Sequence, residues 1–258
     1  LSETLTANYR WALNDDHSFN FLLGQEGIDY QSSGFQVSTQ GQNNDRLTNL
    51  LTGTRATSWP DSNSAYSYLS FFFRGEYNYK DLYYAEVAAR TDASSRFGAD
   101  HRWGMFWSLG FMWNIKNEAF LKDIEWLTSA QVKLSTGTSG NSEIPYYDHL
   151  ALVSGDANYN DEAGIYPSQS GNEELSWEQT WANNVGVSFG LYNRVNVNVD
   201  FYHKKTTNML MLVPQSYAIT GVGNRWDNIG AMMNRGVEIA IDGDVIRTKD
   251  FTWNLSAN

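Results

Sequence analysis

Four features are absent or scarce in this 258-residue chain. Cysteine is missing, which excludes both a disulfide framework and a thiolate metal site. Proline occurs only four times, which suits long uninterrupted strands. The formal net charge is −11 and lysine and arginine form no cluster, so the sequence lacks the basic stripe that a nucleic-acid-binding surface needs.

Long apolar runs are the fourth absence. No stretch of about 18 apolar residues occurs, so no membrane-spanning helix is predicted. The chain alternates instead: Val195, Val197, Val199 and Phe201 are apolar, and the residues between and after them carry polar groups. A period of two indicates a β-strand whose two faces meet different environments. Such strands escape a hydropathy scan because only alternate residues are apolar.

Ten stretches share this alternation, and we predict that they are strands. They cover residues 3–13, 17–26, 66–77, 82–91, 103–115, 126–136, 181–191, 195–205, 232–243 and 250–258. Most are about nine to eleven residues long, which crosses a bilayer when the strand is tilted, whereas soluble strands average five or six. The strand centres carry no charge on the apolar side, where Lys or Arg would cost roughly 2–4 kcal/mol at the bilayer midplane. The sequence therefore predicts an all-β, antiparallel transmembrane β-barrel.

The connections between these strands are alternately short and long, as in outer-membrane barrels with short periplasmic turns. Residues suited to positive φ predict tight turns at Asn14–Asp15, Asn78–Asp81, Tyr192–Arg194 and Gly243–Asp244. The long links cover residues 27–65, 92–102, 137–180 and 206–231, and an intermediate link covers 114–125. Aromatic rings gather near the short turns, as in a headgroup-level girdle: Trp11, Tyr77, Tyr79, Tyr83, Trp113, Trp126, Tyr192 and Trp253.

The chain begins and ends inside predicted strands, so we expect it to be a piece of a longer barrel. An open sheet in lipid leaves unpaired backbone groups at both edges, each costing several kcal/mol. Further strands are therefore expected to close the barrel.

Several motifs follow one another in order along residues 90–238 of the predicted sheet. Residues 90–98 read RTDASSRFG and are followed by RWGMFWSLG at 102–110. These motifs resemble those of the SusC/RagA-type TonB-dependent outer-membrane transporters of Bacteroidetes. Matches then continue in family order with Glu118 and Phe120, KLSTGTSGN at 133–141, LSWE at 175–178, NML at 208–210, NIG at 228–230 and NRGVE at 234–238. Ala93 replaces a usual glycine, and Ser135–Thr136 replace an aromatic-containing segment. These departures alter a loop and a strand face without disturbing the assignment.

The resemblance implies fold, partners and function. Family barrels have about 22 strands, so residues 1–258 would be a partial TonB-dependent receptor β-barrel domain supplying about ten of them. The plug domain, the TonB box and the remaining strands are absent from this chain. The implied function is active, TonB-dependent import of glycan or peptide oligomers across the outer membrane, with a SusD-like surface lipoprotein as lid. No cofactor and no nucleic-acid partner is expected, and membrane lipid surrounds the barrel.

Charged residues opposite the apolar set are expected to face the lumen and take part in transport: Arg74, Glu76, Glu86, Arg90, Lys133, Asp200 and Glu238. Aromatic rings in the long loops stack on sugars and pack on peptides. The candidate ligand or lid contacts are therefore Trp59, Tyr146, Tyr147, Tyr159, Tyr166 and Trp226, with loop–loop packing as the alternative.

Other motifs favour structural interpretations. Arg90, Asp92, Arg96 and Asp100 form either a charged rim or, as we favour, a loop network that fixes a strand end. Trp177–Glu178 is expected to anchor a strand start. Residues 156–162 resemble a calcium loop but lack its glycine and its bidentate glutamate, so a solvated acidic loop is favoured.

No catalytic or metal chemistry is predicted. His17, His101, His149 and His203 show no ligand spacing, so no metal site is expected. A nucleophile elbow, a P-loop and a zinc helix are all missing, so we do not expect an enzyme. Two rivals to the importer stay open, namely a passive outer-membrane porin and a secreted glycan-binding β-protein that uses the same aromatic residues.

Overall fold

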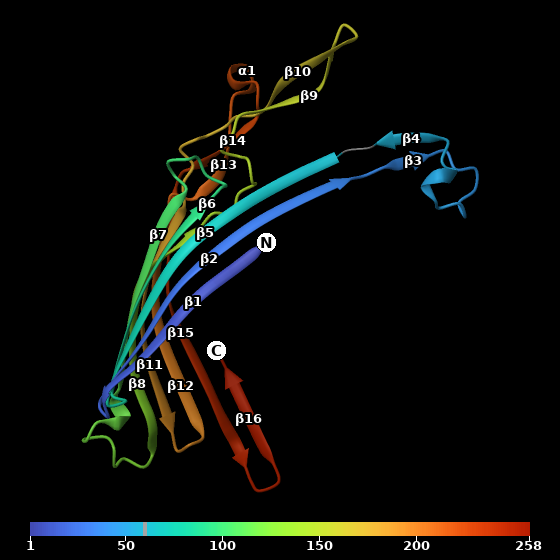
Figure 1. Cartoon of the computed structure of the whole chain (residues 1–258). Helices are drawn as coiled ribbons and strands as arrows, with labels where there is room; N and C mark the ends of the chain where they lie inside the picture. Colours follow the sequence, from blue (N-terminus) through green and yellow to red (C-terminus); the bar gives the residue numbers. More distant parts are fainter. Residues whose placement is uncertain (59–60) are drawn as a thin grey trace.

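A computed structural model describes residues 1–58 and 61–258. Its main element is one antiparallel sheet of ten strands, each paired with the next along the chain (Figure 1). In sheet order the strands are β1 (Ser2–Asn14), β2 (His17–Phe35), β5 (Asp61–Tyr79), β6 (Tyr83–Ser94), β7 (Trp103–Asn114), β8 (Leu127–Asn141), β11 (Glu178–Leu191), β12 (Val195–Thr207), β15 (Ala231–Arg247) and β16 (Thr252–Ala257). All ten predicted strands are confirmed.

The register divides the sheet into two faces that run unbroken across its strands. Val187 is opposite Val132 and Val199, and Val199 is opposite Ile239. We call this the apolar face, and it also carries Phe71, Leu109 and Phe201, all of which are exposed in the isolated chain. The other side is the polar face. No helix in the part of the chain described is long and apolar enough to span a bilayer.

Three small hairpins occupy the long links, at the end of the sheet away from the short turns (Figure 1). They are formed by β3 (Ser38–Gln40) with β4 (Arg55–Ser58), β9 (Leu152–Tyr159) with β10 (Glu162–Gln169), and β13 (Leu210–Pro214) with β14 (Asn224–Asn228). Short helical turns are η1 (Leu50–Thr52), η2 (Ile115–Asn117) and α1 (Tyr217–Thr220). The long links are thus more regular than the sequence predicted.

Several strands extend further towards the loops than predicted, β2 and β5 most of all. Each has 19 residues, and Phe35 is still opposite Asp61 at the end of their ladder. The extensions read QSSGF and DSNSA at their far ends and lack the apolar alternation. Beyond the bilayer no lipid selects one face, so backbone pairing continues while the sequence pattern disappears.

The predicted turn at Gly243–Asp244 is wrong. Strand β15 continues through both residues to Arg247, with an irregular register between Asp244 and Ile246. The Asp244 amide donates to the carbonyl of Arg194, which holds the strand beside the neighbouring turn. The real turn lies at Thr248–Phe251, where the Thr248 hydroxyl accepts the Phe251 amide at 3.0 Å.

The other three short turns lie where they were predicted. The Asn14 side chain accepts hydrogen bonds from the amides of Asp16 and His17, both at 2.9 Å. Tyr192 and Asn193 both have φ of 54°, the left-handed conformation of a tight hairpin turn. Side-chain acceptors and left-handed residues therefore set the register of these hairpins locally.

The buried hydrophobic cluster of the described chain lies among the loops, outside the apolar face. Phe97, Ile144 and Leu175 are buried together, with Trp177 and Trp226 packed against them. We call these residues, with Leu210, the loop core. The loops therefore form a packed assembly at one end of the sheet.

Candidate functional site

The polar face holds all seven residues predicted to face the lumen. The ladder connects Arg74 and Glu76 on β5 through Glu86 on β6 to Lys133 on β8, and on to Asp200 and Glu238. Two cavities of about 680 and 710 Å³ lie against this face and are lined largely by its residues. The polar face is therefore the hollowed side of the sheet.

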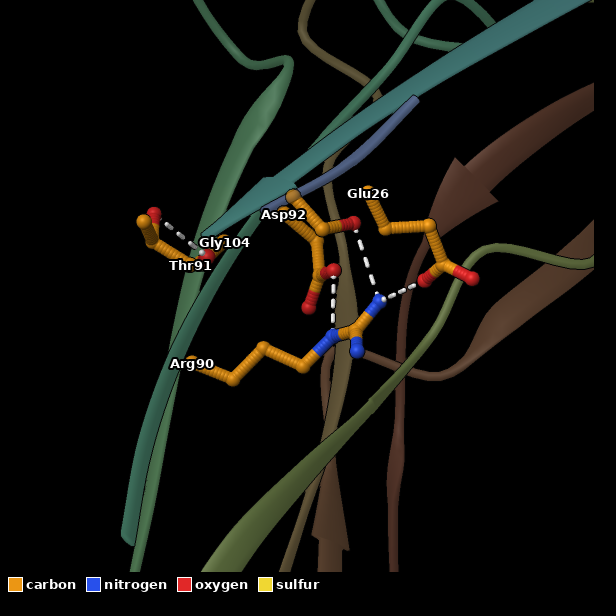
Figure 2. A network of polar contacts seen from close by, with 6 residues as sticks. Glu26, Arg90, Thr91, Asp92 and Gly104 are labelled. Atoms are coloured by element: carbon orange, nitrogen blue, oxygen red, sulfur yellow. Dashed lines mark hydrogen bonds and ion pairs between the residues drawn. The ribbon is translucent and has the colours of Figure 1, made fainter. Parts of the chain in front are cut away.

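Arg90 is the centre of the densest polar network on this face (Figure 2). Its Nε donates to Asp92 at 2.6 Å, and one terminal nitrogen donates to Glu26 and to the Ser70 hydroxyl, both at 2.9 Å. Glu26 comes from β2, Ser70 from β5, and Arg90 and Asp92 from β6. Asp92 is only 7% exposed, so the cation compensates a nearly buried carboxylate. The network joins the loop end of β6 to the middle of β2 and β5.

An aromatic ring supports the Arg90 guanidinium. The guanidinium lies 5.4 Å from the centre of the Phe72 ring, a cation–π arrangement. Phe72 is opposite Gly24, and its ring fills the space that a β-carbon at that position would occupy. Gly24 therefore permits the Phe72 position that supports Arg90.

Arg74 organises a second network closer to the short turns. Glu76 and Glu86 are directly opposite each other on β5 and β6, an arrangement that repels. Arg74 bonds both carboxylates, at 2.6 and 2.7 Å, and Asn20 also donates to Glu76. The arginine thereby offsets one of the two like charges and reduces their mutual repulsion.

The remaining lumen candidates lie further along the sheet. Asp200 is directly opposite Glu238 and also opposite Gly186, whose small size leaves room for the Asp200 carboxylate. Lys133 is the other neighbour of Gly186 and lines the smaller of the two cavities. These three residues form no ion pair within the described part of the chain.

The structure brings two of the loop aromatics, Tyr146 and Tyr147, to the loop end of the sheet. Tyr146 packs on Tyr66 at 4.9 Å, and Tyr66 stacks on Tyr30 at 5.0 Å. The Arg96 guanidinium lies 4.9 Å from the centre of the Tyr146 ring.

Sequence reasoning missed three further tyrosines that pack with these two. We call the five residues the tyrosine cluster: Tyr30, Tyr66, Tyr68, Tyr146 and Tyr147. Tyr66 and Tyr68 are two residues apart on β5, and Tyr30 is directly opposite Tyr66, so all three lie on the polar face. The alternation in the sequence could have placed them there. Arg96 also donates to the carbonyl of Ile144 at 2.9 Å, in agreement with a loop network, whereas Asp100 is exposed in the link before β7.

Trp226 packs in the loop core and does not lie on an open surface. Residues of several family motifs, such as Leu175 and Leu210, also belong to the loop core. Trp177 donates to the carbonyl of Arg102 at 2.8 Å. Glu178 accepts the amide of Leu210 at 3.0 Å, and the Asn228 amide group bonds Ser176 and Asn208. The motifs around Leu175, Asn208 and Asn228 therefore hold three separate loops together.

Tyr159 and Tyr166 lie on the β9–β10 hairpin, apart from the tyrosine cluster. Tyr159 is 85% exposed near the hairpin turn, which Asn160 and Asp161 make with positive φ. Residues 156–162 thus form a hairpin end, and hydrogen bonds from Ser154 and Tyr166 lower the pKa of Asp156. Trp59 lies outside the described residues.

Two more loop and turn carboxylates have perturbed acidity. Burial raises the pKa of Asp148, which borders a cavity of about 250 Å³ with Arg225 and Trp226. Hydrogen bonds from Asn78 and Tyr84 lower the pKa of Asp81 in the β5–β6 turn. Across the described residues no group of three or more His, Asp or Glu is placed to hold a metal ion.

The sequence of residues 2–258 matches the family described as TonB dependent receptor-like, beta-barrel. The chain belongs to this family. It is 34% identical to TonB-dependent receptor P39 of Formosa agariphila and 32% identical to TonB-dependent receptor SusC of Bacteroides thetaiotaomicron. These alignments cover 97% and 94% of the chain but only 24% and 25% of the relatives. The chain thus spans about a quarter of the curated relatives it matches.

Solved structures give the same assignment. A structure titled "RagAB peptide importer in the 'closed-closed' state" matches with a TM-score of 0.90 and 36% identity, over 99% of this chain and 28% of that one. The 'open-open' state matches with a TM-score of 0.87. The siderophore receptor PirA of Acinetobacter baumannii, at 14% identity and a TM-score of 0.61, shares the fold alone.

These matches confirm the predicted SusC/RagA-type family and the barrel fold. The ten-stranded sheet is a segment of an outer-membrane β-barrel.

Proposed function

We propose that this chain forms part of the barrel wall of a transporter that imports glycan or peptide oligomers across the outer membrane, driven through TonB. The observation that carries the proposal is the 36% identity over 99% of the chain to the structure titled as a peptide importer. The polar face supplies the wet, charged wall that passage of a polar oligomer requires. The proposal concerns the whole protein, of which this chain is a segment.

The polar face presents charges of both signs, which favours a generally polar wall over a pore that selects ions by charge. Arg74 and Arg90 each bond two carboxylates, so both cations are paired within the sheet and each group keeps one excess negative charge. A charge-selective pore instead presents uncompensated charges of one sign at its constriction. Arg74, Glu76, Glu86 and Arg90 thus contribute polarity and rigidity, while Lys133, Asp200 and Glu238 supply the free charges.

The tyrosine cluster is our proposed contact for incoming substrate. Tyr30 is 42% exposed and stacks on Tyr66, and Tyr68 lines the larger cavity. Aromatic rings offer flat apolar surface to sugar faces and to peptide side chains alike. Tyr146 and Tyr147 extend the same cluster from a loop.

The projecting hairpins are proposed to meet a SusD-like surface lipoprotein. Tyr159 and Ile165 on β9–β10 are 85% and 75% exposed, and Ile219 beside β13–β14 is 85% exposed. Exposed apolar residues at loop ends are typical of protein contacts. TonB is proposed as the energy-coupling partner on the periplasmic side, and no catalysed reaction is proposed.

Energy dependence separates the importer from a passive porin. Cells expressing the full-length protein would be assayed for uptake of labelled oligomers with and without a protonophore. The importer requires that uptake stop when the proton gradient collapses and when the tonB gene is deleted. Uptake that continues at an unchanged rate in both conditions would contradict the proposal and favour the porin.

A further inference from the structure

The apolar face changes character at the loop ends of three neighbouring strands. Above Phe201 and Val237, the next outward residues on β12 and β15 are His203 and Arg235, which are directly opposite each other. One step further, Lys205 is flanked by Trp181 on β11 and Met233 on β15. Lys205 and Arg235 are therefore diagonal neighbours on a face that is otherwise apolar.

Strand geometry puts these cations at the outer edge of the hydrocarbon. At about 3.3 Å per residue, the eight steps from Val195 to His203 cover roughly 26 Å along the strand. A tilt of about 40° reduces this to roughly 20 Å of depth above the short turn, close to the height of the apolar band. Lys or Arg is tolerated there, whereas the same residues at the midplane are costly.

Charge complementarity identifies the kind of partner. The whole chain has a net charge of −11, yet the outward positions of β8, β11, β12 and β15 hold these cations and no carboxylate. Among the described residues, neither Lys205 nor Arg235 forms an ion pair, in contrast to Arg74 and Arg90 on the polar face. Both side chains are exposed. The patch presents positive charge without an internal partner.

We propose that Lys205 and Arg235 bind the phosphate of an anionic lipid in the outer leaflet, with Trp181 beside it. Diagonal neighbours on paired strands lie about 7–8 Å apart, so both long side chains reach one phosphate between them. Arginine and lysine are the usual protein partners of phosphate oxygens. The exposed Trp181 ring suits the interface level, where tryptophan is enriched.

Continuity with the apolar face argues for a lipid over another protein. Directly below the cations, Phe201 and Val237 offer an apolar surface on which the acyl chains of the same molecule lie. Headgroup and chains of one lipid thus meet matching surfaces in one column of the sheet. A second copy of this chain would oppose the patch with the same cations and would be repelled.

The test uses the full-length receptor purified in detergent and native mass spectrometry. The probes are phosphatidylglycerol, zwitterionic phosphatidylethanolamine and inorganic phosphate. The variant is Lys205→Gln with Arg235→Gln, and the matched control is Lys204→Gln, one residue away on the polar face of the same strand. Unheated electrophoretic mobility checks that every variant is a folded barrel.

The proposal requires that the wild-type receptor prefer phosphatidylglycerol to phosphatidylethanolamine by about tenfold or more, since each cation at an anionic surface adds favourable free energy. The double variant loses that preference and the control keeps it. Inorganic phosphate at equal concentration leaves lipid binding unchanged.

Three results would overturn the proposal. The first is an unchanged preference in the double variant, and the second is equal loss in the Lys204→Gln control. Displacement of the lipid by inorganic phosphate would assign the patch to a free anion instead.

Discussion

The bilayer-spanning sheet and the loop core differ in what surrounds their apolar side chains. On the apolar face Phe71 is 44% exposed and Val237 is 61% exposed in the isolated chain, and we infer that lipid supplies their contacts. In the loop core Phe97 and Leu175 are 0% exposed and protein supplies every contact. The sheet therefore depends on its solvent, while the loops depend on packing.

This difference accounts for four of the family motifs, whereas the motifs at 102–110, 133–141 and 234–238 lie in strands β7, β8 and β15. The motifs at residues 94–98, 175–178, 208–210 and 228–230 lie at or beside the loop core, where Phe97 and Leu175 are buried and Glu178 and Asn228 form hydrogen bonds. On the apolar face any residue of similar hydrophobicity serves, because lipid adapts to its shape. A change in the loop core should accordingly cost more than the same change on the apolar face.

The largest expected effect is that of Phe97→Ala. Removing a fully buried phenylalanine costs about 3–5 kcal/mol because a cavity remains. Hydrogen exchange of the amides of residues 142–178 in the full-length receptor should accelerate by about 100-fold or more. The matched control Phe71→Ala leaves no cavity, since lipid fills the space, and these amides should be unaffected. Equal acceleration in both variants would remove the distinction between the two regions.

Placing a charge on each face of β12 should give the next largest effect. Val197→Arg puts a cation on the apolar face and is expected to cost roughly 2–4 kcal/mol. Asn198→Arg, one residue along, puts the same cation on the polar face at small cost. Urea unfolding of the receptor in lipid vesicles measures both. Comparable losses of stability would mean that both faces meet the same environment.

Arg90→Ala should cost about 1–3 kcal/mol, because Glu26 and the nearly buried Asp92 lose their cation. Arg74→Ala should cost only about 0–1 kcal/mol, since its ion pairs are half-exposed. The midpoints of urea unfolding in vesicles distinguish the two. A larger loss for Arg74→Ala would show that burial does not rank these networks.

Glu118→Ala should cost about 1 kcal/mol, less than the loss expected for Arg90→Ala. The Glu118 carboxylate accepts hydrogen bonds from the Tyr83 hydroxyl at 2.8 Å and the Trp113 indole at 3.1 Å, so it joins two girdle rings. Glu118→Gln keeps an acceptor oxygen and should retain most of the stability in the same unfolding assay. Full loss in the glutamine variant would mean that charge, rather than the hydrogen bonds, matters.

The sequence predicted the ten strands because lipid and lumen impose opposite demands on alternate residues. It could not predict the extensions of β2 and β5 or the hairpins in the loops, where both faces meet water or protein. The Gly243–Asp244 turn failed because turn-forming residues also fit an irregular strand position. The backbone bond from Asp244 to Arg194, which holds the strand there, is invisible in the sequence.

For the candidate site, the alternation of apolar and polar residues was enough to assign each residue to a face of the sheet. It could not show which residues form hydrogen bonds or ion pairs with each other. Arg74, Glu86 and Arg90 were predicted on the polar side, but their partners depend on the register between strands. Tyr146 meets Tyr30 and Tyr66 across long stretches of sequence, so only the folded chain reveals that cluster. Loop aromatics look alike in sequence, whether exposed as Tyr159 or packed as Trp226.

Contact between the apolar face and acyl chains can be measured directly, because this chain contains no cysteine. Single cysteines at Val199 and Asn198, in a full-length receptor without other cysteines, would carry nitroxide spin labels in lipid vesicles. We expect oxygen, which concentrates in lipid, to relax the label at Val199, and a water-soluble nickel complex to relax the label at Asn198. Equal or reversed accessibilities at the two positions would show that the apolar face does not meet lipid.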